Sequence, residues 1–142
     1  MKSNIKLIHL IDKLSVGGAE RVLVDLCNIQ NSNNIDVSVL TTVEPGDLID
    51  DLNLGINRIN LDRINKFSIT KMYALSKIIN QFDIVHVHLR HNLKYVWFVS
   101  KLFKIKSKII FQDHSSKKRI DFFLKKAIYQ TSYVGVSQSM CN

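Results

Sequence analysis

Short apolar runs alternate along the chain with longer segments that are apolar on one side only. The first run, residues 5–11, reads IKLIHLI and is typical of a strand buried on both faces. Residues 19–30 then place apolar side chains at the spacing of one helix face. The same alternation predicts later strands at residues 35–42, 56–61, 83–88, 108–112 and 133–136, a short helix at 47–53, and longer helices at 68–80, 93–104 and 118–129.

Regular strand–helix alternation predicts an α/β, Rossmann-like domain, with a mostly parallel sheet and helices on both of its faces. The chain has 142 residues, which is enough for one domain with a proper core. Neither an internal repeat nor a low-complexity linker divides it, so we treat residues 1–142 as a single domain. Cys27 is expected to be a buried thiol on the first helix.

Polar segments follow three of the predicted strands. Gly17 and Gly18 come after the first strand, residues 88–92 after the fourth, and residues 113–116 after the fifth. In a parallel sheet these segments meet at one edge, where α/β proteins bind ligands. Glycines there let a phosphate or sugar approach the backbone, next to the free N–H groups of a helix N-terminus. A turn that simply needs positive φ explains the two glycines equally well.

Four histidines lie in or beside the predicted strands. His86 is interpreted as a core histidine bonded to the backbone, and His9 as structural. His88, and His91 in the segment that follows it, lie nearer the edge of the sheet, where packing and ligand binding are both open interpretations. His114 is the strongest candidate, because a neutral imidazole at a strand end can donate to a sugar hydroxyl or a carbonyl oxygen. We predict no metal site, since no carboxylate or thiol completes a ligand spacing.

Charge is distributed unevenly along the chain. The net charge is +8, with −3 over residues 1–60 and +11 over residues 61–142. This asymmetry indicates an anionic partner for the second half. The predicted helix at 118–129 combines basic with apolar residues, as surface helices that lie in lipid headgroups do. The basic residues expected to face a membrane are Lys117, Lys118, Arg119, Lys125 and Lys126. The alternative is that these residues only solvate a helix packed on the sheet.

The preceding helix, at 93–104, carries Trp97, Phe98, Leu102 and Phe103, which we expect to lie in the core. We see no clear set of exposed aromatics for stacking bases, and we therefore expect no nucleic-acid partner.

Four segments, in this order, resemble family 4 glycosyltransferases of the GT-B fold. They are Gly17-Gly18-Ala19-Glu20-Arg21, the DIVHVH strand at 83–88, the strand end at 111–115, and Val134-Gly135-Val136-Ser137. The chain departs from the family in having Ser132-Tyr133 where an acidic residue is often found upstream of the last segment.

The resemblance implies a retaining enzyme that transfers a sugar from a nucleotide sugar to a glycan or lipid-linked acceptor, as in surface polysaccharide synthesis. No metal or other cofactor is implied, since the nucleotide sugar is a co-substrate. Carried over by position, Gly17 and Gly18 bring backbone N–H groups to the donor diphosphate, and His114 bonds the donor sugar as the catalytic residue. The acceptor is bordered by His88, Arg90, His91 and Asn92.

A complete member of that family has a second, C-terminal donor-binding domain. Residues 1–142 therefore resemble one half of a GT-B architecture: a fragment, a truncated frame, or one part of a split enzyme whose C-terminal half is on another chain. We expect no activity from this half alone. The expected location is cytoplasmic, at the inner face of a membrane. The alternative is a non-catalytic basic module that binds a polyanion or an anionic membrane.

Overall fold

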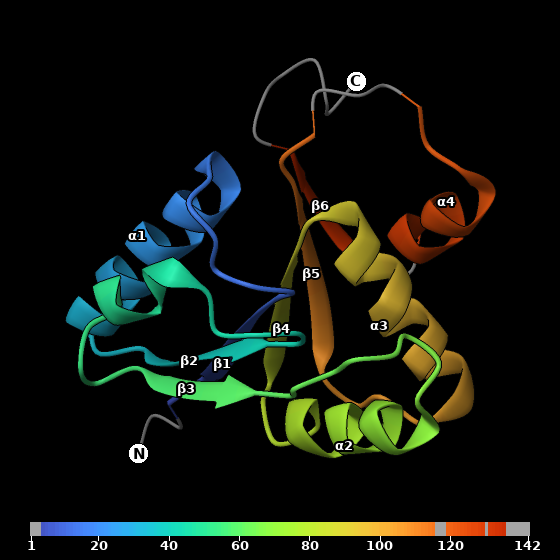
Figure 1. Ribbon diagram of the computed structural model, residues 1–142, viewed down its shortest axis with the longest axis horizontal. Helices are drawn as coiled ribbons and strands as arrows, with labels where there is room; N and C mark the ends of the chain where they lie inside the picture. Colours follow the sequence, from blue (N-terminus) through green and yellow to red (C-terminus); the bar gives the residue numbers. More distant parts are fainter. Residues whose placement is uncertain (1–3, 116–118, 130, 136–142) are drawn as a thin grey trace.

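The chain folds around one parallel β-sheet (Figure 1). The computed structural model describes residues 4–115, 119–129 and 131–135. Within these ranges the strand order is β3-β2-β1-β4-β5-β6, and every neighbouring pair is parallel. The strands are β1 (Lys6–Ile11), β2 (Asp36–Thr41), β3 (Asn57–Asn60), β4 (Ile84–His88), β5 (Lys108–Asp113) and β6 (Ser132–Gly135). The predicted α/β, Rossmann-like class is confirmed.

Helices follow the strands as the sequence pattern predicts. They are α1 (Gly18–Ser32), α2 (Ile69–Ile79), α3 (Arg90–Leu102), α4 (Phe122–Tyr129) and the short 3-10 helix η1 (Asp47–Asp51). Ser68 caps α2, because its hydroxyl accepts a hydrogen bond from the backbone N–H of Lys71. This placement confirms the predicted start of that helix.

Two apolar cores lie on opposite faces of the sheet. On one face Leu7 and Ile11 of β1 pack with Leu23 and Cys27 of α1. On the other face Ile8 and Leu10 pack in a core that includes residues of α2, α3 and α4. Consecutive β1 side chains thus enter different cores, as the alternation of a strand requires. Helices therefore cover both faces of the sheet. Burial in the first of these cores raises the pKa of the Cys27 thiol to about 12.

The strand order reverses between β1 and β4. From β1 the chain proceeds outward to β2 and β3, whereas from β4 it proceeds to β5 and β6 on the other side. In sheets of this order, ligands bind in the crevice outside the carboxyl ends of the two central strands. His9 and His86 are direct neighbours across this boundary, so the histidines lie beneath that crevice.

The start of α3 differs from the prediction. The helix begins at Arg90 rather than residue 93, and Asn92 is buried in its first turn instead of capping it. The Asn92 side-chain amide donates to the His88 carbonyl oxygen, 2.9 Å away, so the amide points into the protein. Leu89 precedes the helix with φ 70° and ψ 141°, a backbone conformation that residues other than glycine rarely adopt.

The region around α4 also differs from the prediction. The helix begins at Phe122, because the Asp121 carboxylate accepts the backbone N–H of Leu124 at 2.8 Å and acts as an N-cap. Phe98 and Leu102 of α3 were expected in the core, but they are 41% and 59% exposed. Lys117 and Lys118, and Ser137 at the end of the last family-like segment, lie outside the described residues.

Candidate functional site

The glycine loop leads from β1 into α1. Gly17 is the N-cap residue, with extended φ −165° and ψ 168°, and Gly18 is the first residue of the helix. Neither glycine has positive φ, so the interpretation as a turn that needs positive φ is wrong. A β-carbon on Gly18 would meet nothing within 4 Å, and the atoms nearest to one on Gly17 belong to the flexible Glu20 carboxylate. Packing within the described protein therefore does not require either glycine, which favours close approach of a ligand.

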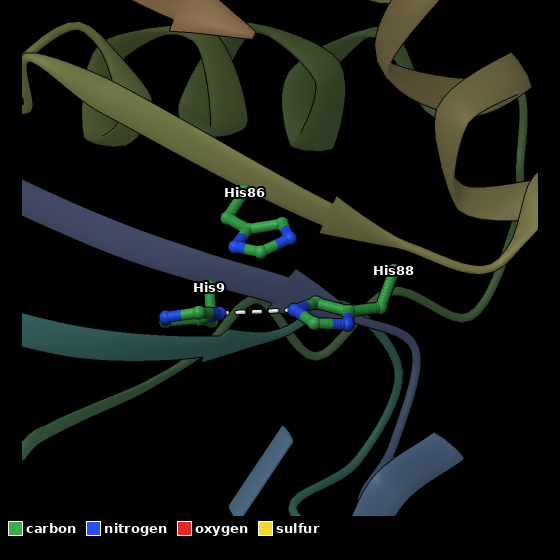
Figure 2. Close-up of side chains that lie close together, drawn as sticks. All are labelled: His9, His86 and His88. Carbon is green, nitrogen blue, oxygen red and sulfur yellow. Dashed lines mark hydrogen bonds between the residues drawn. The ribbon is translucent and has the colours of Figure 1, made fainter. Parts of the chain in front are cut away.

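A chain of hydrogen bonds runs from α1 through three histidines to the edge of the sheet. The Gln30 Oε1 atom lies 2.8 Å from His9 Nε2, and His9 Nδ1 lies 2.9 Å from His88 Nε2 (Figure 2). His88 Nδ1 lies 3.2 Å from His114 Nε2. His9 and His88 are fully buried, whereas His114 is only partly buried. The chain thus joins the interior to the crevice.

Burial keeps the inner histidines neutral at pH 7. It lowers the pKa of His9 to about 3, that of His86 to about 4, and that of His88 well below the usual 6.5. His86 stacks on His88, with ring centroids 4.4 Å apart, but it does not join the hydrogen-bond chain (Figure 2). The expected hydrogen bond from His86 to the backbone is not found among the described residues, where its Nε2 has no hydrogen-bond partner. A hydrogen bond with the Gln112 side chain opposes the shift of the His86 pKa.

His114 follows β5 at the edge of the sheet. Burial lowers the pKa of His114, and the negative charges of Asp113 and Glu20 oppose that shift. Glu20 belongs to the first turn of α1, so a charge next to the glycine loop acts on His114. The structure therefore brings together two segments that the sequence analysis assigned to the same ligand.

An ion pair joins the start of α3, just after β4, to the end of β5. Arg90 Nε and Nη2 lie 2.8 and 2.6 Å from Asp113 Oδ2, and the Asp113 side chain is fully buried. Arg90 Nη1 also donates to the carbonyl oxygen of Arg119. Arg90 was predicted to border the acceptor. In the structure its guanidinium is engaged by Asp113 and holds the start of α3 against the end of β5.

Asp12 is a residue of this edge that the sequence analysis missed. It follows β1 directly, and its carboxylate lies 3.3 Å from His91 Nε2 and 3.3 Å from Asn92 Nδ2. Burial raises the pKa of Asp12, but the hydrogen bonds from His91 and Asn92 outweigh this effect and lower it to about 2. An acidic residue immediately after the first strand was the available signal.

The residues predicted to border the acceptor differ in accessibility. His91 is 53% exposed at its side chain and lies at the edge of the sheet. His88 and Asn92 are fully buried, so they support the edge from beneath instead of lining it. Two of the predicted membrane-facing residues, Lys125 and Lys126, are exposed on α4, and Arg119 is exposed before it.

Among the described residues, the group that comes nearest to a metal site consists of His9, His86 and His88. Their candidate ligand atoms lie within 4.8 Å of one another. Two of these rings already share a hydrogen bond, and the stacked rings of His86 and His88 are only 22° from parallel. Lone pairs lie in the ring planes, so these rings do not converge on one ion in the observed geometry. The prediction that no metal binds stays a prediction.

A cavity of about 490 Å³ lies away from this edge. It is bordered by residues of α3 and α4 and by the first residues of β5 and β6, including Trp97, Lys108, Ile109 and Ser132. These strand residues are at the amino ends, opposite the carboxyl ends that carry His88 and His114. We place the candidate site at the carboxyl edge, because the strained Leu89 backbone, the glycine loop and the histidine chain meet there.

These features define an α/β domain with a candidate ligand site at the carboxyl edge of its two central strands. The chain belongs to glycosyltransferase family 4: the sequence profile described as Glycosyltransferase Family 4 matches residues 16–140. No curated protein shows significant similarity to the chain. None of the described helices is long and apolar enough to cross a membrane.

Proposed function

We propose that the chain is the acceptor-side domain of a retaining GT-B glycosyltransferase. It works with a C-terminal donor-binding domain to move a sugar from a nucleotide sugar to a glycan or lipid-linked acceptor. Gly17 and Gly18 present backbone N–H groups to the donor diphosphate, and His114 contacts the donor sugar. The acceptor enters beside His91 and Asp12. We further propose that this reaction serves surface polysaccharide synthesis at the cytoplasmic side of a membrane.

One observation carries this proposal within a family 4 domain. The glycine loop, which no packing contact of the described protein requires, lies at the same edge as His114 and is electrostatically linked to it through Glu20. A diphosphate at the start of α1 would meet free backbone N–H groups and the positive end of the helix dipole. A sugar attached to that diphosphate would then lie close to the histidine.

Donor binding is testable on the chain itself. ¹⁵N-labelled protein is titrated with UDP, UDP-glucose, UDP-N-acetylglucosamine and GDP-mannose, and amide shifts are followed by NMR. We expect weak binding, with the largest shifts at Gly17, Gly18 and His114. Shifts confined to the cavity between α3 and α4 would contradict the proposed site.

Transfer requires the second domain. The chain is joined to the C-terminal domain of a family 4 glycosyltransferase and supplied with radiolabelled nucleotide sugars and membrane lipid extract. We expect labelled product from the joined protein and none from residues 1–142 alone. Robust transfer by the chain without a partner domain would contradict the half-enzyme proposal.

A second candidate function, docking on an anionic membrane, is favoured by an exposed aromatic patch on α3 and α4. The patch consists of Phe98, Phe122 and Phe123, which are 41%, 63% and 47% exposed. The Phe98 and Phe123 rings lie 5.7 Å apart, and the Lys126 ammonium lies 4.5 Å from the centre of the Phe122 ring. Leu124 and Ala127 are buried, so α4 packs on the domain with one face and presents aromatic and basic side chains on the other.

Co-sedimentation with lipid vesicles tests this docking. Vesicles of phosphatidylcholine alone are compared with vesicles that also contain phosphatidylglycerol. Binding should require the anionic lipid, weaken as salt rises, and fall when Arg119, Lys125 and Lys126 are changed to Gln, since each basic group contributes about 1 kcal/mol near such a surface. The matched control changes Lys6, Lys66 and Lys77 to Gln. Equal recovery with both vesicle types would contradict docking.

A further inference from the structure

The hydrogen-bond chain beneath the crevice has a defined direction. The Gln30 Oε1 atom is an acceptor, so the His9 Nε2 atom facing it at 2.8 Å carries the hydrogen. A neutral imidazole has one N–H and one lone pair, and His9 Nδ1 is therefore the acceptor in the next bond. His88 Nε2, 2.9 Å away, must then be the donor.

The same logic extends to the edge of the sheet. Since His88 Nε2 carries the hydrogen, His88 Nδ1 has the lone pair and accepts from His114 Nε2 across 3.2 Å. Burial keeps His9 and His88 neutral, so neither ring can offer two donors. No single hydrogen bond in this series can reverse its direction alone, because each neutral ring has only one N–H.

We propose that Gln30, His9 and His88 are positioning residues that fix His114 in its Nε2–H tautomer. The ring nitrogen left for the crevice, Nδ1, is then a hydrogen-bond acceptor. The His86 ring stacks on His88, with ring centroids 4.4 Å apart, and packs against His9 at 4.8 Å with a tilt of 34°, so it restricts the rotation of both rings. The tautomer of the edge histidine is thus determined by a glutamine three hydrogen bonds away, on α1.

This arrangement narrows what the site recognises, an inference that rests on the proposed function. A neutral His114 accepts through Nδ1, so it recognises a hydroxyl of the donor sugar as a hydrogen-bond donor. It does not donate to a carbonyl oxygen. This acceptor role differs from the donor role expected from the sequence. The sequence alone does not show which residue bonds His114 Nε2.

Imidazole NMR tests the tautomer independently of any activity. Long-range ¹H–¹⁵N spectra of ¹⁵N-histidine protein at pH 7.5 distinguish the two neutral forms of each ring, and single His→Gln variants assign the signals. We expect His9, His88 and His114 in the Nε2–H form. An Nδ1–H form of His114, or an average of both forms, would overturn the proposal even if sugar transfer were intact.

Variants of Gln30 test the origin of the effect. Gln30→Leu removes the acceptor, and we expect the His114 signals to shift toward a mixture of tautomers. Gln30→Glu keeps an acceptor oxygen and should retain the Nε2–H form. Gln81→Leu is the matched control, because Gln81 is exposed and its side chain bonds only the nearby Lys77 carbonyl oxygen. An unchanged His114 tautomer in folded Gln30→Leu would overturn the assigned role of Gln30.

Discussion

The Arg90 guanidinium contacts one oxygen of the buried Asp113 carboxylate through two nitrogens, at 2.8 and 2.6 Å. Arg90 begins α3 and Asp113 ends β5, so this pair holds the start of the helix against the end of the strand beside the crevice. The Asp113 carboxylate also accepts the backbone N–H of Ser115, at 2.9 Å, which directs the chain past His114. A charged contact at the edge of the sheet thus orients the segment that carries the principal candidate residue.

Arg90→Ala should destabilise the protein strongly. It leaves the Asp113 charge buried without its guanidinium, which typically costs about 3–5 kcal/mol. Arg21→Ala is the matched control, since Arg21 also lies 2.8 Å from an aspartate, Asp51, but both side chains are nearly half exposed. Exposed pairs contribute about 0.2–1 kcal/mol. Urea unfolding of both variants measures the difference, and equal losses would contradict a special role for Arg90.

Gly18→Val should affect binding more than folding. The open space around a β-carbon at this position predicts a change in unfolding free energy of less than about 1 kcal/mol. In the protein joined to a donor-binding domain, the added side chain should obstruct the diphosphate and weaken nucleotide-sugar affinity. Calorimetric titration measures that affinity, and thermal unfolding provides the stability control. Unchanged affinity would show that the loop does not approach the donor.

His114→Ala should lower turnover in the joined enzyme by about 10²-fold or more, the usual effect of losing an electrostatic contact to the transition state. Folding should change little, although His88 Nδ1 loses its partner at a cost of about 1 kcal/mol. Initial rates at saturating nucleotide sugar give the result. His91→Ala is the comparison, because it should affect the KM for the acceptor instead of turnover. Wild-type turnover in His114→Ala would contradict the catalytic assignment.

Stability should decrease on acidification in the range where the buried histidines would take up protons. Folding lowers the pKa of His9 to about 3 and that of His86 to about 4, whereas in the unfolded chain both lie near 6.5. The unfolded state therefore binds more protons below pH 6.5. The stabilisation is complete above that pH and is lost progressively as pH falls toward 4 and then 3. Each neutral histidine adds a slope of up to about 1.4 kcal/mol per pH unit.

Urea unfolding at pH 7.5, 6, 5 and 4 measures this slope. His86→Leu should reduce it, because one titrating group is removed and its Nε2 had no hydrogen-bond partner among the described residues. Gln81→Leu should leave the slope unchanged, since Gln81 is exposed and the substitution removes no titrating group. A free energy of unfolding that stays constant from pH 7.5 to 4 would contradict the buried neutral cluster.

The sequence by itself determined the α/β class, the order of the described strands and helices, and the edge at which polar residues collect. Those features follow from local periodicity and from the rule that parallel strands share one carboxyl edge. The resemblance of Gly17–Arg21 and the later segments indicated the family, which the match over residues 16–140 confirms. It also selected His114 and the glycine loop as candidates, whose roles stay predictions.

Only the tertiary structure decided which polar side chains pair with one another. His9 and His88 are 79 positions apart in sequence, and parallel pairing of β1 with β4 brings them together at the switch point. Asp12, at the end of β1, likewise contacts His91 and Asn92, which follow β4. Burial, and with it the proposed hydrogen-bond direction and tautomer of His114, depends on these long-range contacts. Local sequence patterns predict individual elements, whereas the chemistry of this site arises where two distant strands meet.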